Sequence, residues 1–134
     1  MLPKTFHSLI DQPRLIAAIA AAEHKTIGRI YVYVSHRPIK DALAQAHRRF
    51  AKLGLGRIHD HRASVLIYIA PQTHKFAIVG DTAVHERCGD AYWNQLAENL
   101  SRDLKAGDIT AALLNAITSL EATLAEHFPV ASGR

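Results

Sequence analysis

Two short apolar runs in the middle of the chain define the centre of the expected fold. Residues 64–70 are rich in β-branched and aromatic side chains and end at Pro71, which is typical of a strand buried on both faces. After a polar turn, residues 75–80 make a second apolar run. Because the gap between the runs is short, we expect the two strands to pair as an antiparallel hairpin.

The spacing of apolar residues elsewhere predicts helices and one further strand. Residues 29–35 alternate as a strand does, and apolar stripes at helical spacing precede and follow it. We expect the first helix to start at Asp11, the second to open at Pro38, and Asp108 to cap the last. The predicted buried stripes are Leu15, Ile16, Ile19, Ala20 and Ala22, then Leu43, Ala46, Phe50 and Leu53, then Trp93, Leu96, Leu100 and Leu104, then Leu113, Ile117, Leu120 and Leu124.

This order of elements predicts an α/β fold, a three-layer α/β/α sandwich with a small mixed sheet. The strands at 29–35 and 64–70 should be parallel and joined by a right-handed crossover, and the strand at 75–80 should form an antiparallel edge. About four helices would cover the sheet. One domain spanning residues 1–134 accounts for the chain, with residues 1–11 and 130–134 loosely ordered.

Composition narrows the choice of partners and compartment. The 16 basic and 12 acidic residues give a net charge of +4 and are scattered, and the densest basic stretch lacks interleaved aromatic residues. We therefore expect no nucleic-acid binding.

The single Cys88 excludes an internal disulfide and fits a reducing compartment. No apolar segment is long enough for a signal peptide or a membrane span, so we expect no membrane insertion and a cytoplasmic location.

Ligand-type side chains are concentrated in two loops, residues 58–64 before the central strand and residues 80–91 after the hairpin. Antiparallel pairing brings the end of the third strand near the start of the second, so we expect these loops to converge. Calcium prefers carboxylate oxygens, whereas zinc would also recruit imidazole from His59, His61 or His85. We expect a divalent cation, calcium first, with magnesium, manganese or zinc as alternatives. The metal ligands would come from Asp60, Asp81, His85, Glu86 and Asp90.

Several of the candidate residues also have a simpler structural interpretation. Asp90 stands directly before Ala91 and could cap a helix, and His59 and His61 could be solvated loop residues. A metal pair of His85 and Cys88 is disfavoured, because a lone cysteine more often packs as a small apolar residue. No Gly-x-Ser-x-Gly elbow or Gly-rich phosphate loop occurs, so we expect neither a covalent hydrolase nor a nucleotide cofactor. Any hydrolysis would use a metal-activated water.

Three motifs resemble the TPM domain, found in thylakoid-lumen, photosystem II repair and many bacterial proteins. They are Val-Leu-Ile-Tyr-Ile-Ala at 65–70, Phe-Ala-Ile-Val-Gly-Asp at 76–81, and Val-His-Glu at 84–86 with Gly-Asp-Ala-Tyr-Trp at 89–93. The resemblance runs from about residue 28 to about residue 129 and is closest to the short, soluble bacterial branch. It implies an α/β/α sandwich. In this family some members have been assigned weak acid phosphatase activity, and some bind calcium or another divalent ion.

The resemblance extends to the candidate site, with two departures. Asp90 matches an acidic position that follows the third strand in many TPM domains, and Asp81, His85 and Glu86 match the Gly-Asp and Ile-His-Glu pattern. The family's Asn-Gly before the central strand is replaced by Ala63-Ser64, and its glycine before the His-Glu pair by Ala83. These replacements remove conformations that glycine adopts most easily.

Two functional hypotheses follow from the sequence. The first is a TPM-type domain that binds a divalent cation between residues 58–64 and 80–91, with weak phosphatase activity as an extension. The alternative is a non-catalytic protein-interaction module that works through a protein partner and has no functional metal site. In either case we expect a monomer or a weak dimer.

Overall fold

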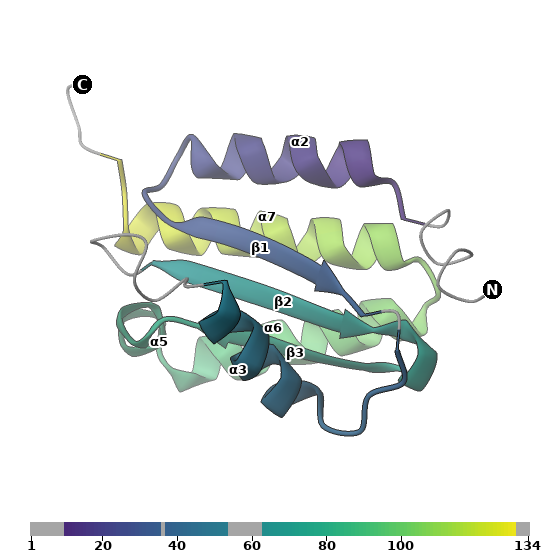
Figure 1. Cartoon of the computed structure of the whole chain (residues 1–134). Helices are drawn as coiled ribbons and strands as arrows, with labels where there is room; N and C mark the ends of the chain where they lie inside the picture. The colour runs from purple at the N-terminus through teal and green to yellow at the C-terminus, as the bar shows by residue number, and fades with distance from the viewer. Residues whose placement is uncertain (1–9, 36, 54–62, 131–134) are drawn as a thin grey trace.

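The computed structural model describes residues 10–35, 37–53 and 63–130, which form a layered α/β domain (Figure 1). In chain order the elements are α2 (Gln12–Glu23), β1 (Arg29–Val34), α3 (Ala42–Lys52), β2 (Ser64–Ala70), the 3-10 turn η1 (Pro71–Thr73), β3 (Lys75–Gly80), α5 (Thr82–Cys88), α6 (Asp90–Lys105) and α7 (Ile109–His127). None of the helices within these ranges is both long and apolar enough to cross a membrane.

The sheet is mixed and has the strand order β1-β2-β3, which confirms the topology predicted from the sequence. β1 runs parallel to β2, with Arg29 opposite Ser64, and β3 runs antiparallel to β2, with Val65 opposite Gly80. Every residue of β2 is buried, because the strand has a neighbour on each side and helices over both faces. The apolar run at 64–70 is therefore the central strand of the sheet.

The two faces of the sheet carry separate cores. Alternate side chains of β2, including Val65, Ile67 and Ile69, face a large core shared with α2, α5, α6 and α7. Tyr68 and Ala70 face a smaller core under α3. Figure 1 shows α3 in front of the sheet and α6 and α7 behind it. This is the expected α/β/α arrangement, with α5 as a further short helix in a stretch that was predicted to be a loop.

Aspartate side chains begin three of the helices. Asp11, Asp41 and Asp108 each accept a hydrogen bond from the backbone N–H three residues later, at 3.2, 3.0 and 3.0 Å. The predicted helix starts at Asp11 and Asp108 are confirmed. The start at Pro38 was wrong, because Asp41 supplies the cap and α3 begins only at Ala42.

Part of the predicted helix stripes is also wrong. Leu43 on α3 is 53% exposed and Ile16 on α2 is 66% exposed, whereas Ala42 and Ala46 are buried against the sheet. Small side chains on α3 allow the helix backbone to approach β2 and β3 closely, which turns Leu43 toward solvent. Ile16 lies at the edge of a groove between α2 and β1 and is not covered by another element.

A buried threonine connects the beginning of β1 with the end of α7. The Thr26 side chain is 1% exposed, and its hydroxyl bonds to the carbonyls of Leu124 and Phe128 while accepting the N–H of Gly28. Thr26 also forms an isolated antiparallel bridge with Pro129. These bonds add to those that the same carbonyls accept from backbone N–H groups, Leu124 from Phe128 and Phe128 from Ile27.

Candidate functional site

Asp81 lies where the end of β3 meets the start of β2. The backbone N–H of Ser64 donates to Asp81 Oδ2 at 3.0 Å, and the backbone N–H of Asp81 donates to the Ser64 carbonyl at 3.0 Å. Both residues are buried, Asp81 at 6% exposure. The expected convergence of these two strand ends is therefore present, and one carboxylate oxygen of Asp81 is used to join them.

His85 and Asp90 form the one close pair among the candidate ligands that the structure describes. His85 lies on α5, and the chain turns at Gly89, where φ is +84°, before α6 begins. The turn places His85 Nδ1 3.7 Å from Asp90 Oδ1, and both side chains are exposed. Gly89 rather than Asp90 occupies the N-cap position, so the alternative role of Asp90 as the cap was wrong. As the first residue of α6, Asp90 turns its carboxylate toward His85.

The remaining candidate ligands are spread apart or fall outside the described ranges. Glu86 is exposed on α5, next to His85 in sequence. Asp60, His59 and His61 lie outside the residues that the structure describes. The next described residue is Ala63, which directly precedes the start of β2 near Asp81. Within the described ranges, no three His, Cys, Asp or Glu side chains are grouped closely enough to hold a metal ion.

Cys88 behaves as a packing residue. Its side chain is partly buried and contacts the large core. Burial and, after it, the negative charge of Glu126 raise the pKa of the Cys88 thiol above the usual 9.0. Metal binding requires the thiolate, so a raised pKa disfavours a metal site that pairs Cys88 with His85.

Trp93 lies between the candidate site and the end of β3. Its ring centroid is 5.5 Å from that of His85 and 5.5 Å from that of Tyr92. A Cβ atom built on Gly80 would lie 3.2 Å from two atoms of the Trp93 ring, so the indole packs directly on the strand backbone. The Trp93 Nε1 atom is buried and has no hydrogen-bond partner. Trp93 belongs to the buried stripe predicted for this helix, and packing against the sheet accounts for most of this arrangement.

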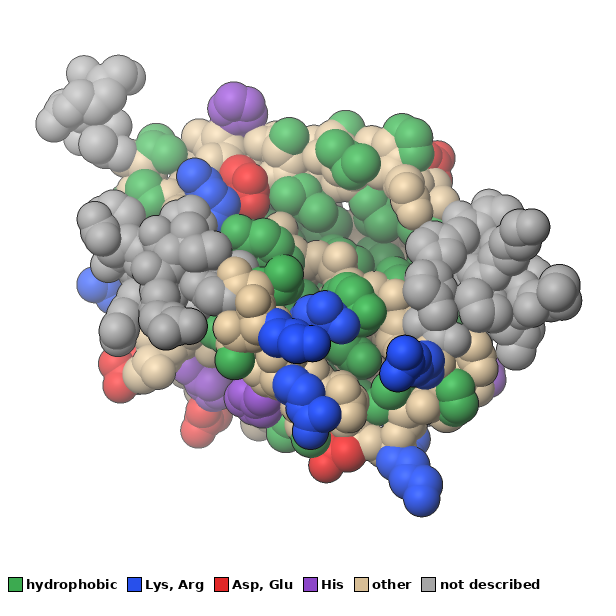
Figure 2. All heavy atoms as spheres, in the orientation of Figure 1, with side chains coloured by type: hydrophobic (Ala, Val, Ile, Leu, Met, Phe, Trp, Pro, Cys, Tyr) green, Lys and Arg blue, Asp and Glu red, His purple; other side chains and the backbone are tan. Residues whose placement is uncertain are grey.

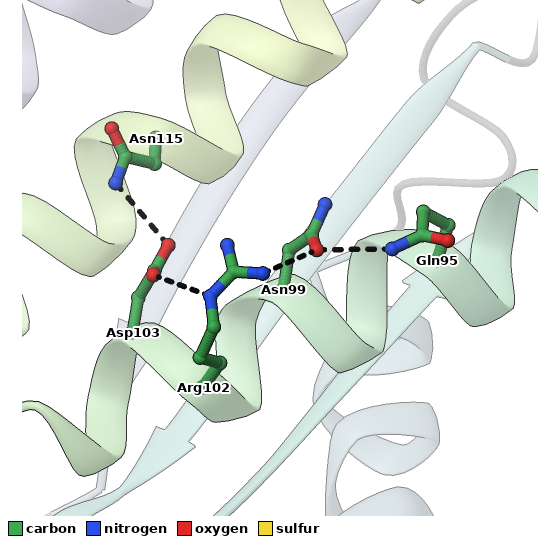
Figure 3. Close-up of polar contacts among 5 residues, drawn as sticks. All are labelled: Gln95, Asn99, Arg102, Asp103 and Asn115. Carbon is green, nitrogen blue, oxygen red and sulfur yellow. Dashed lines mark hydrogen bonds and ion pairs between the residues drawn. The ribbon is translucent and has the colours of Figure 1, made fainter.

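A second group of polar side chains, which was not predicted from the sequence, lies between α6 and α7 (Figure 3). Asn99 Oδ1 accepts from Gln95 Nε2 at 3.0 Å and from Arg102 Nη1 at 3.2 Å. Asp103 accepts from Arg102 Nε at 3.3 Å and from Asn115 Nδ2 of α7 at 3.2 Å. The spacing of residues 95, 99, 102 and 103 on one helix face is the signal that could have predicted this cluster. Its bonds connect the two helices and leave no pair of groups with obvious reactivity.

The layered fold and the residues at the end of β3 agree with a known family, whose model, the TPM domain, matches residues 8–123. The chain belongs to the TPM domain family. This TPM domain is similar in structure to the BA42 protein from the psychrophilic bacterium Bizionia argentinensis, with a TM-score of 0.82 and 26% identity over 90% of this chain and 82% of that one.

A second similar structure extends the comparison at the level of the fold. It is the N-terminal domain of the cg2496 protein from Corynebacterium glutamicum, with a TM-score of 0.62 and 17% identity over 82% of this chain and 68% of that one. No curated protein matches the sequence. The family and the fold of this TPM domain are therefore shown, and its biochemical role has to be argued from its own residues.

Proposed function

We propose that this TPM domain binds a divalent cation at the surface formed by the end of β3, α5 and the start of α6. The observation that carries the proposal is the distance of 3.7 Å between His85 Nδ1 and Asp90 Oδ1, both exposed to solvent. Two ligand atoms on a tetrahedral zinc ion with bonds of about 2.0–2.1 Å lie about 3.3 Å apart. A small side-chain movement would therefore bring both atoms onto one ion.

The other candidate ligands contribute differently to this proposal. Asp60 is the third ligand that the sequence predicts, and its segment joins β2 at Ala63, next to Asp81. Asp81 holds this junction through its bonds with Ser64, so we assign it to positioning. Glu86 is exposed beside His85 and is available as a further carboxylate. A site of this kind would be shallow and open to water.

The choice of ion depends on whether His85 takes part. Calcium and magnesium take oxygen ligands, which Asp90 and Asp60 supply, whereas zinc and manganese also accept imidazole nitrogen. His85→Ala should therefore weaken zinc and manganese binding and leave calcium binding almost unchanged. Asp90→Asn should weaken the binding of every ion.

The decisive experiment is a titration of chelator-treated protein with calcium, magnesium, manganese and zinc. Backbone amide shifts should saturate and be confined to residues 58–64 and 80–91. Trp93 is the single tryptophan, 5.5 Å from the His85 ring, so its fluorescence provides an independent signal. Glu98→Gln on the exposed side of α6 is the matched control for Asp90→Asn and should bind like the wild type. Unchanged spectra at millimolar metal would contradict the proposal.

Weak phosphatase activity is the extension of the same proposal. Asp60 and Asp90 would hold the ion, and the ion would lower the pKa of a bound water. His61 would protonate the leaving oxygen, or His85 would do so where an oxygen-preferring ion such as calcium leaves its imidazole free. Hydrolysis of p-nitrophenyl phosphate should then require added metal and disappear in Asp90→Asn while Glu98→Gln retains it. Metal binding without any hydrolysis would exclude the phosphatase activity and leave the proposed cation site unaffected.

A protein-interaction role is the second candidate, supported by an apolar groove between α2 and β1. The groove has a volume of about 200 Å³ and is lined by Ile10, Gln12, Leu15, Ile16, Ile19, Val32 and Val34. Figure 2 shows hydrophobic side chains along this groove and Lys and Arg side chains gathered below it, over α3. Arg49 of α3 reaches β1, where its guanidinium stacks on Tyr33.

This groove would accept an extended peptide that adds a strand to β1. β1 is an edge of the described sheet, and the N–H of Ile30 at this edge already donates to Glu23 at 2.9 Å. Val32 and Val34 direct their backbone groups to the same edge. A peptide of alternating valine and glutamate should shift amides 30–35, and Ile16→Lys should abolish the effect. Leu43→Lys on α3 is the control, and an absence of shifts would exclude this partner.

A further inference from the structure

We propose that the opposite end of the sheet holds a binding site for a small anionic amphiphile, meaning a carboxylate, sulfonate or phosphate with an apolar body. A cavity of about 360 Å³ lies there, between η1, the start of β3 and the junction of α6 with α7. Lys75 at this end and Gly80 at the other are the two ends of β3. The cavity is therefore separate from the proposed cation surface.

The floor of the cavity is apolar. Ile69 and Pro71 are buried, and Phe76, Leu104 and Ile109 are partly buried and present side-chain surface to the opening. A volume of this size falls at the lower end of the range of about 300–1,000 Å³ that is typical of small-molecule sites. Such a floor would bury a short aliphatic chain or a single aromatic ring.

The rim of the cavity is cationic. His74, Lys75 and Lys105 are exposed and line it, and none of its lining residues is acidic. Asp108 follows Gly107 in sequence, but its carboxylate accepts the N–H of Ala111 as the cap of α7. An anionic head group would therefore meet the Lys105 side chain with no carboxylate from the lining competing for it, whereas a cationic head group would be repelled.

Two features of the backbone support a ligand at this place. The cavity lies beyond the carboxyl end of β2, where the chain turns from the parallel pair into the antiparallel strand, and α/β sheets commonly bind ligands at such ends. His74 adopts a left-handed conformation with φ of +55°, which is unusual for a residue other than glycine. Lys75 Nζ donates to the Lys40 carbonyl at 2.6 Å, beside the start of α3 on the other face of the sheet, so Lys105 is the lysine whose ammonium group serves the rim.

The test compares three amphiphiles with the same eight-carbon tail: octanoate, octanol and octyltrimethylammonium, each kept below its aggregation concentration. Amide shifts are followed in wild-type protein. Octanoate should give saturable shifts confined to residues 69–76 and 101–109, octanol weaker shifts at the same residues, and octyltrimethylammonium none. Equal responses to all three would overturn the assignment of an anionic ligand, and an absence of response to octanoate would overturn the site.

Variants separate the contribution of the rim from that of the floor. Lys105→Glu should weaken octanoate binding by about tenfold, the loss expected for one charge-assisted contact. Lys52→Glu carries the same charge change on the exposed end of α3 and should have no effect. Ser101→Phe should fill the cavity and abolish binding of both octanoate and octanol. Equal weakening by Lys105→Glu and Lys52→Glu would show only a response to net charge and would overturn the site.

Octanoate titrations also test whether this site is independent of the proposed cation site. Asp90→Asn should bind octanoate like the wild type, and chelator treatment should not change the affinity. Loss of octanoate binding in Asp90→Asn would contradict two independent sites at opposite ends of β3.

Discussion

Asp81 and Ser64 are joined by two hydrogen bonds that run in opposite directions. The Ser64 N–H donates to the Asp81 carboxylate and the Asp81 N–H donates to the Ser64 carbonyl, each at 3.0 Å. These bonds close the end of the β2–β3 ladder next to the proposed cation surface. A carboxylate that is buried and bonded in this way has a structural role of its own.

Asp81→Ala should lower the free energy of unfolding by about 2–3 kcal/mol, because the buried Ser64 N–H loses its partner. Asp81→Asn keeps an acceptor oxygen and should cost about 1 kcal/mol. Urea denaturation measures both values. Asp90→Ala removes the same charge from an exposed position and should change stability by no more than about 0.5 kcal/mol. Similar losses for Asp81→Ala and Asp90→Ala would contradict the structural role.

Gly80→Ala should destabilise the domain by about 1–3 kcal/mol, because the added methyl group would lie 3.2 Å from two atoms of the Trp93 ring. The cost should be smaller when Trp93 is already replaced by Phe, since the smaller ring removes the atoms in question. A double-mutant cycle by thermal or urea unfolding measures this coupling. Additive effects of the two substitutions would show that Gly80 is not required for the close approach of the indole.

Thr26→Val should lower stability by about 2–3 kcal/mol while keeping the shape of the side chain. The valine cannot bond the Gly28 N–H or the carbonyls at the end of α7, and these groups are buried around Thr26. Thr118→Val on the exposed face of α7 is the control and should be nearly neutral. Hydrogen exchange at Gly28 gives a second measurement, and unchanged protection of this amide would count against the assigned bond.

Cys88 should react slowly with thiol reagents in the native protein. Burial and then the charge of Glu126 raise the pKa of its thiol above 9.0, so the folded state keeps the proton at pH values where the unfolded chain releases it. This contribution to stability is complete below the unfolded pKa and is lost as the pH rises through the folded pKa.

Two measurements test this behaviour of Cys88. Glu126→Gln removes one cause of the shift and should speed alkylation of Cys88 at about pH 8. From about pH 8 to about pH 10, the free energy of unfolding of Cys88→Ala should fall less steeply than that of the wild type. An alkylation rate like that of a small free thiol, or equal pH slopes for the two proteins, would contradict a raised pKa.

The strands were the most predictable part of the fold. Pro71 and the polar turn after it mark the boundary between two apolar runs, and β2 and β3 occupy the expected residues. α5 was missed because a seven-residue helix carries too few turns for a periodic signal. It is held by Val84, which is completely buried in the large core. Its stability therefore comes from packing, which the local sequence does not reveal.

Predictions of which helix residues are buried were less reliable, because they depend on the surface against which each helix packs. Leu43 and Ala42 are equally good candidates for an apolar stripe, and the close approach of α3 to Tyr68 and Ala77 selects the alanine. In the candidate site, proximity of the strand ends was predictable from the hairpin. Two details of the site were not predictable, because they depend on local backbone geometry. One is the hydrogen bond from the Ser64 N–H to the Asp81 carboxylate. The other is the turn at Gly89, which pairs His85 with Asp90.

The packing of α2 along α7 has a consequence for synthesis of the chain. Thr26 bonds to carbonyls 98 and 102 residues later, and α2 shares much of its contact surface with the last helix. On the ribosome the β2–β3 hairpin can form as soon as it emerges, but α2 stays without its main helical partner until α7 has been made. The nascent chain would thus expose the apolar face of α2 for nearly the whole of translation, and chaperones that hold such segments would act on it at that stage.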